Sequence, residues 1–245
     1  MSDSSAPDAG ESPAPSVGLV FVSHSRQIAA GLVELARQMA PTVTLIAAGG
    51  RDDGGIGTSF DAVAAGIADA DHGAGVVVLC DLGSAILTAE TALDFLDDEV
   101  RARVRLADAP LVEGGVAAAV AAEVGGDLAA VLSAAESARG AGAGAAASAD
   151  APAPAAEAVD RTVRRTATLR NRDGLHARPA ADFVKLASTF DAEVSVNGRD
   201  AHSLLGIMGL GLTRGMSVEI TGPDERSRAA VDALADLIES GFGEE

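Results

Sequence analysis

Two kinds of hydrophobic pattern alternate along the first half of the chain. Short continuous apolar runs, such as residues 17–22 and 75–80, are typical of strands that are buried on both faces. After the first run, residues 27–39 place apolar side chains at helical spacing, which predicts an amphipathic helix. The alternation continues with strands at 42–48 and 104–107 and with helices at 59–70, 85–96 and from about 115 onward. It predicts an α/β fold, with a mostly parallel, doubly wound sheet that helices cover on both faces.

A different pattern fills the last third of the chain. Residues 162–170 alternate between apolar and polar side chains, as in a strand with one face in solvent, and residues 177–189 read as a helix that buries one apolar face. Further strands are expected at 192–197, 198–203 and 216–222, with Asn197 and Gly198 in a hairpin turn, and helices at 204–209 and 225–240. This order predicts an α+β open-faced sandwich, in which helices stack on one face of a four-stranded antiparallel sheet.

Composition marks the segments around these two patterns. Residues 1–16 are rich in Ser, Ala, Pro and acidic side chains and have no apolar periodicity, so we expect a disordered tail. Residues 140–158 read GAGAGAAASADAPAPAAEA, a low-complexity run that has too little apolar surface to fold alone. We therefore expect a first domain at 17–137, a flexible linker at 138–160 and a second domain at 161–245.

Charge and cysteine content narrow the class of protein. Residues 1–160 hold 7 basic and 23 acidic side chains, and the whole chain has a net charge of −18 and neither Trp nor Tyr. Such a chain repels nucleic-acid phosphates and lacks the usual base-stacking side chains, so no nucleic-acid partner is expected. The single cysteine, Cys80, excludes an internal disulfide, and no apolar segment suited to export or membrane insertion precedes the first domain. We therefore expect a cytoplasmic protein with no membrane partner.

Polar residues gather at three strand-to-helix junctions of the first domain. His24 lies between Ser23 and Ser25 directly after the first strand, and Asp81 follows the strand at 75–80. Open N–H groups at helix starts favour a bound anion such as phosphate, and a neutral imidazole is a nucleophile that can carry the phosphoryl group. A carboxylate on one ring nitrogen leaves the other nitrogen free to attack, and Asp81 is the candidate. The residues expected to support the phosphate are Ser23, Ser25, Gly57, Thr58, Ser59, Gly83 and Ser84.

Each of these residues also has an ordinary structural interpretation. His24 alone could be a loop histidine bonded to backbone, and Asp81 alone is more often a helix cap. Small hydroxyl residues and glycines commonly begin helices. Only their joint placement at neighbouring junctions favours the phosphate site.

A second histidine stands at the start of a helix in the second domain. His176 precedes the helical run, and Pro179 falls in the first turn, where its missing N–H costs nothing. The free amides of this turn, from Ala177 onward, can hold a phosphate attached to His176, and Arg178 can donate to the phosphate oxygens. The placement therefore predicts reversible phosphorylation of His176.

The second domain resembles HPr, the histidine-containing phosphocarrier of the bacterial phosphotransferase system. The motifs GLHARPAADFV and HSLLGIMGLGLTRGMSVEI carry the resemblance. It implies that His176 is the phosphorylated residue and that Arg178 stabilises the phosphate. Ser203 lies where some HPr proteins carry a regulatory phosphoserine, but in this chain no Lys or Arg stands directly before the serine. Regulation at Ser203 and simple helix capping therefore both stay open.

The first domain resembles the mannose-type IIA domain of the same system. The motifs VSHSRQIAAGLVELARQM, IGTS, DLGSAILTAETALDFL and APLVEGGVAAAV carry this resemblance. It implies that His24 is the phosphohistidine, that Asp81 orients it and that the domain forms a homodimer. Together with the HPr-like domain, the chain most closely resembles the DhaM family, the phosphotransfer subunits of the phosphoenolpyruvate (PEP)-dependent dihydroxyacetone kinases.

These resemblances imply a phosphotransferase subunit that works as a phosphohistidine relay. Enzyme I, charged by PEP, phosphorylates His176, and the linker raises the effective concentration of that domain near His24. The recipient is ADP on the partner subunit DhaL, and the ATP formed serves the partner DhaK. This chain then needs no cofactor of its own, and its four scattered histidines predict no metal site.

Two alternatives and one further expectation accompany this hypothesis. The sequence stops at Glu245 without an enzyme I-like domain, so a separate enzyme I is expected. The first alternative is a phosphocarrier for a mannose-family sugar permease. The second is a protein whose phosphorylation state regulates a partner.

Overall fold

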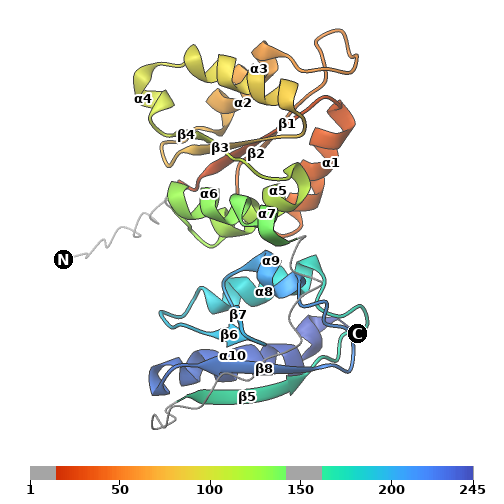
Figure 1. The fold of residues 1–245 in the computed structure, drawn as a ribbon, viewed down its shortest axis with the longest axis vertical. Helices are drawn as coiled ribbons and strands as arrows, with labels where there is room; N and C mark the ends of the chain where they lie inside the picture. Colours follow the sequence, from red (N-terminus) through yellow and green to blue (C-terminus); the bar gives the residue numbers. More distant parts are fainter. Residues whose placement is uncertain (1–14, 142–161, 245) are drawn as a thin grey trace, which may run out of the picture.

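The computed structural model describes residues 15–141 and 162–244, which form two domains (Figure 1). The predicted tail, except for its last two residues, and most of the predicted linker lie outside these ranges. The first residues of the predicted linker form the short helix α7 (Ala138–Ala141). The helical part of the first domain therefore extends beyond the predicted domain end at residue 137.

A four-stranded parallel sheet forms the centre of the first domain. All residues of strands β1 and β3 are buried, which explains why their sequences lack polar alternation. The sheet has the order β2-β1-β3-β4, with β1 at Gly18–Ser23, β2 at Leu45–Gly49, β3 at Val76–Cys80 and β4 at Val104–Leu106. The predicted parallel sheet is confirmed.

Helices cover both faces of this sheet (Figure 1). Val20 and Val22 of β1 pack in the core under α2 and α3, whereas Leu19 and Phe21 pack in the core under α1 and α5. The bounds are α1 Arg26–Arg37, α2 Phe60–Ala70, α3 Gly83–Asp94, α4 Asp98–Arg101, α5 Leu111–Glu123 and α6 Leu128–Glu136. The single turn α4 is absent from the sequence prediction.

Helix α5 begins at Leu111, before the predicted start near residue 115. Gly114 and Gly115 therefore lie inside the helix. A Cβ on Gly114 would come within 2.8 Å of the Ala109 Cβ, and one on Gly115 would come within 3.0 Å of the Phe21 ring. Close packing rather than a helix boundary explains these two glycines.

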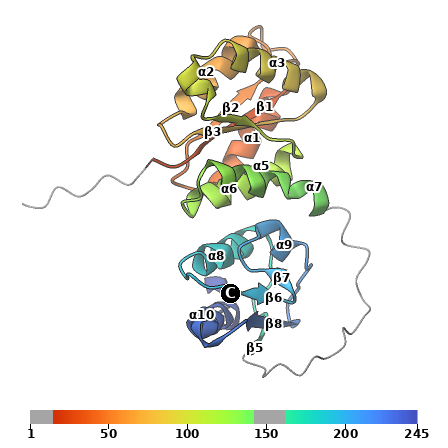
Figure 2. The ribbon, with the colours of Figure 1, turned by 60° about the vertical axis from the view of Figure 1, so that its left-hand side comes forward.

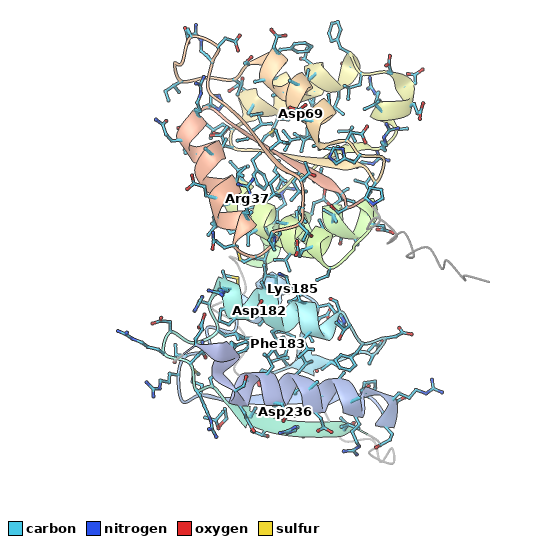
Figure 3. All side chains as sticks on the ribbon, turned by 180° about the vertical axis from the view of Figure 1, so that it is seen from behind. Arg37, Asp69, Asp182, Phe183, Lys185 and Asp236 are labelled. Carbon is cyan, nitrogen blue, oxygen red and sulfur yellow. The ribbon has the colours of Figure 1, made fainter. Side chains whose placement is uncertain are left out.

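The second domain is an antiparallel sheet with helices on one face, as predicted. Asn197 and Gly198 both have positive φ, 45° and 78°, in the hairpin turn between β6 and β7. Phe183 points from α8 into the domain interior and is fully buried (Figure 3). The sheet has the order β5-β8-β6-β7, with β5 at Val163–Thr168, β6 at Ser195–Val196, β7 at Arg199–Asp200 and β8 at Ser217–Gly222. The helices are α8 at Ala177–Ala187, α9 at Leu204–Met208 and α10 at Arg228–Glu239, and 3₁₀ turns occupy Glu225–Ser227 (η1) and Gly241–Gly243 (η2).

The two domains contact each other through helices. α8 and α9 of the second domain lie against α5 and α7 of the first, on the side of the first domain opposite α2 and α3 (Figures 1 and 2). Leu205 of α9 forms a small buried cluster with Ala117 of α5 and Ala138 of α7. Lys185, on the side of α8 that faces the first domain (Figure 3), lies with its Nζ 3.8 Å from Glu123 Oε1.

Candidate functional sites

The first site forms where β1 and β3 end side by side. Val22 of β1 is in register with Cys80 of β3, so the residues that follow these strands meet at the same edge of the sheet. His24 and Asp81 lie there, with His24 Nδ1 2.9 Å from Asp81 Oδ1. Both side chains are mostly buried, with 21% and 17% exposed. The structure therefore brings together the predicted histidine and its predicted carboxylate.

Four contacts fix the carboxylate of Asp81. Its Oδ2 accepts hydrogen bonds from Ser23 Oγ at 2.8 Å and from the His24 backbone N–H at 2.9 Å. Its Oδ1 faces the imidazole and also accepts from the Leu82 N–H at 2.7 Å. Burial opposes ionisation of Asp81, but these hydrogen bonds outweigh it and lower the pKa of the carboxyl. The ionised carboxylate then accepts from His24 Nδ1–H and leaves Nε2 without a proton.

Nε2 of His24 faces the start of helix α3. Ser84 Oγ lies 2.7 Å from this nitrogen, so the hydroxyl donates to the free nitrogen in the tautomer that Asp81 sets. Helix α3 begins at Gly83 with no side-chain cap, which leaves its first amides available to an anion. A phosphoryl group on Nε2 would meet this helix start and the Ser84 hydroxyl.

The other residues that were predicted to support the phosphate stabilise the loops and helix starts around His24. Gly57 N–H donates to the His24 carbonyl at 2.9 Å. Thr58 Oγ1 lies 2.8 Å from Thr88 Oγ1, and Thr88 bonds the Ser84 carbonyl. Sequence reasoning missed Thr88, whose helical spacing of four residues from Ser84 is meaningful only once Ser84 is placed. Two of the predicted hydroxyls cap helices, Ser25 on α1 and Ser59 on α2.

The second site is the start of α8. His176 is the N-cap residue, and its side chain makes no cap hydrogen bond, so the first amides of the helix, from Ala177 onward, stay available. The imidazole is 41% exposed, and its Nε2 lies 3.3 Å from Glu244 Oε2. The Arg178 side chain is exposed and makes no ion pair or hydrogen bond inside the described ranges. Sequence reasoning missed Glu244, because nothing local indicates that the chain end returns to this loop.

The remaining residues that the sequence singled out make contacts that stabilise the fold or lie in its core. Ser203 caps α9 and accepts from the Gly206 N–H at 3.1 Å. Burial raises the pKa of the Cys80 thiol to about 12, so this residue stays protonated in the core. His202 Nδ1 pairs with Asp200 at 3.0 Å. Within residues 15–141 and 162–244, no group of three potential metal ligands occurs, and no helix could span a membrane.

Comparison with known proteins finds both domain types. A family model described as "PTS system fructose IIA component" matches residues 18–132, and one described as "PTS HPr component phosphorylation site" matches residues 163–240. The first match holds the His24 site and the second holds the His176 site.

Individual relatives match one or both of these domains. The "PEP-dependent dihydroxyacetone kinase, phosphoryl donor subunit DhaM" of Escherichia coli is 37% identical over 93% of this chain and 51% of that protein. The "PEP-dependent dihydroxyacetone kinase 2, phosphoryl donor subunit DhaM" of Listeria innocua is 43% identical over 47% of this chain and 94% of that protein. The "Phosphocarrier protein HPr" of Haloferax volcanii is 41% identical over 30% of this chain and 90% of that protein. The chain thus spans about half the length of the E. coli relative, and it belongs to the DhaM family.

Proposed function

We propose that this chain is a phosphotransferase subunit that relays phosphoryl groups from enzyme I through His176 to His24 and on to ADP held by DhaL. One observation carries the proposal. Each histidine has one ring nitrogen against a carboxylate and stands beside a helix start that no side chain caps. This arrangement orients an imidazole for attack and provides amides for the oxygens of the incoming group.

In the first step, Nδ1 of His176 attacks the phosphorus carried by enzyme I. The bond from phosphorus to the donor atom of enzyme I breaks as the Nδ1–P bond forms, so enzyme I is the leaving group. Nδ1 is the attacking atom because Nε2 is the nitrogen that faces Glu244. Arg178, an exposed residue in the first turn of the same helix, is free to donate to the phosphoryl oxygens.

In the second step, Nε2 of His24 takes the phosphoryl group from His176. The Ser84 hydroxyl rotates from Nε2 to a phosphoryl oxygen, and the first amides of α3 bind the same charge. The ring keeps its Nδ1–H and becomes positively charged, and Asp81 stabilises that charge. In the third step, a terminal oxygen of ADP attacks the phosphorus and His24 leaves in its original neutral form.

The assignment to a dihydroxyacetone kinase draws on relatives rather than on the histidine geometry. The subunits of E. coli and L. innocua are named as phosphoryl donors of such kinases. We extend this to the present chain, with enzyme I, DhaL–ADP and DhaK as partners and a homodimer through the IIA domain. The nucleotide is proposed to reside on DhaL, so that this chain carries only the phosphoryl group.

A label chase tests the relay. Wild type, His24→Ala and His176→Ala are each incubated with enzyme I and labelled PEP, and DhaK, DhaL–ADP and dihydroxyacetone are then added. We expect label in dihydroxyacetone phosphate only with wild type, while His24→Ala still takes label at His176. A His176→Ala chain that charges His24 at the normal rate would contradict the order of the two steps.

The same experiment separates the alternatives. If wild type takes label at both histidines but never delivers it to dihydroxyacetone, the kinase assignment is wrong. Labelled chain is then offered to a mannose-family sugar permease. Transfer to the permease supports the carrier alternative, and retention of the label supports a regulatory role.

A further inference from the structure

A carboxylate near the end of the second domain reaches back to its histidine. Glu244 follows η2, and its Oε2 lies 3.3 Å from Nε2 of His176, 68 positions earlier in the chain. The contact therefore depends on the folded domain. The Glu244 side chain is 28% exposed, so the carboxylate is partly shielded from solvent.

Packing holds the turn that carries Glu244. Gly241, Phe242 and Gly243 have φ values of 69°, 57° and 70°, a region that a bulky residue such as Phe rarely adopts. Phe242 packs against the core of the domain, and Gly241 lies beside the backbone of Asn171. Tertiary contacts thus maintain a strained turn and direct the carboxylate toward the histidine loop.

A buried amide shares the same carboxylate oxygen. Asn171 is 1% exposed, and its Nδ2 donates to the Gly174 carbonyl at 2.5 Å and to Glu244 Oε2 at 3.4 Å. Because both neighbours of this nitrogen are acceptors, the amide can present only its NH₂ side to them. Asn171 Oδ1 is buried and has no partner among the described residues, a cost that the domain tolerates while the donor side faces Glu244.

We propose that Glu244 is a positioning residue for His176, an inference that rests on the relay proposed above. The carboxylate accepts from Nε2–H and so holds the tautomer in which Nδ1 carries the free lone pair. When Nδ1 takes the phosphoryl group, the bond from phosphorus to the donor atom of enzyme I breaks and Nε2 keeps its hydrogen. The ring then carries a positive charge, which the Glu244 carboxylate stabilises.

Variants of the full chain test this role. Glu244→Ala removes the acceptor, Glu244→Gln keeps an acceptor oxygen without the charge, and Glu239→Ala is the control. Glu239 is an α10 carboxylate that pairs with Arg165. The rate of charging by enzyme I and PEP is measured, together with the ¹⁵N shifts of the His176 ring, which report the tautomer.

Glu244→Ala is expected to lower the charging rate about tenfold and to shift the ring toward the other tautomer. Glu244→Gln should keep the Nε2–H tautomer and charge at an intermediate rate, and Glu239→Ala should match wild type in both measurements.

The outcomes separate this inference from the relay itself. If wild type takes no label at His176, the relay is wrong and the inference falls with it. If wild type charges and Glu244→Ala charges equally fast, the relay stands and the positioning role is wrong. A lower rate with unchanged ring shifts also overturns the role, because general damage to the domain would produce that result.

Discussion

At the residue scale, the two histidines are held through opposite ring nitrogens. Asp81 engages Nδ1 of His24, whereas Glu244 engages Nε2 of His176. The surroundings of the carboxylates differ as well. Asp81 accepts from four groups, while Glu244 contacts only the imidazole and one amide within the described ranges. We therefore expect substitution of Asp81 to have the larger effect.

Asp81→Asn is expected to slow transfer from phosphorylated His176 to His24 by on the order of 10²–10⁴-fold, because the ring loses the charge that fixes its tautomer. Charging of His176 by enzyme I should be unchanged. The measurement is rapid-quench transfer of label between the two histidines. Asp94→Asn is the control, since this exposed residue has Arg101, at 2.9 Å, as its only ion-pair partner in the part of the chain that the structure describes. A variant that transfers within threefold of wild type would show that Asp81 is structural.

The catalytic candidates could be predicted from sequence where local patterns place them. His24, Asp81 and His176 each follow a strand or begin a helix, so the periodicity around them fixes their position in the fold. Glu244 could not be found in this way, because its contact joins residues 68 positions apart through a turn of left-handed residues. Local patterns carry no information about such a return of the chain.

At the element scale, hydrophobic periodicity predicted strands and helices better than their ends. The predicted strand at 192–197 is reduced to the two residues of β6, because only Ser195 and Val196 pair with both neighbours. The predicted helix at 225–240 begins as the 3₁₀ turn η1, which Asp224 caps. The ends of strands and helices depend on pairing partners and on capping contacts. The periodicity of apolar residues carries no information about either.

Two glycines that adjoin or lie in α1 should respond in opposite ways to alanine. A Cβ on Gly49, at the end of β2, would lie 2.7 Å from the Ser25 carbonyl and 2.9 Å from Arg26 Cα. Gly49→Ala should therefore destabilise the first domain by about 1–3 kcal/mol and slow the His24 step, since α1 begins just after His24. A Cβ on Gly31 would meet nothing within 4 Å, so Gly31→Ala should stabilise the domain by about 0.5–1 kcal/mol.

Urea unfolding followed by amide NMR signals of the first domain checks both glycine variants, because the chain has no Trp or Tyr for fluorescence. Equal stability of the two variants would contradict the packing argument.

At the scale of the whole molecule, helix α5 is buried on two sides. It packs on the sheet and on α1 and α6 of its own domain, and its outer side meets α8 and α9. Its sequence, LVEGGVAAAVAAE, is apolar almost all around, which is typical of a helix without a solvent face. The contact between the domains therefore follows from the composition of α5. Periodicity alone could not say which element would cover it.

The docked arrangement should slow the transfer between histidines. Helix α3, whose first turn holds Ser84 beside His24, lies on the side of the sheet away from the second domain (Figures 1 and 2). We therefore expect the second domain to leave α5 and α7 before His176 can reach His24. Leu205→Glu places a charge in the buried cluster with Ala117 and Ala138, so it should release the domains.

Amide ¹⁵N relaxation should then report faster tumbling of the second domain, and rapid-quench transfer to His24 should become faster. Met216→Glu is the control, because Met216 is an apolar residue of the same domain that is already 45% exposed. Independent tumbling of the domains in wild type would contradict a stable contact. Faster tumbling in Leu205→Glu without faster transfer would show that the contact does not limit the relay.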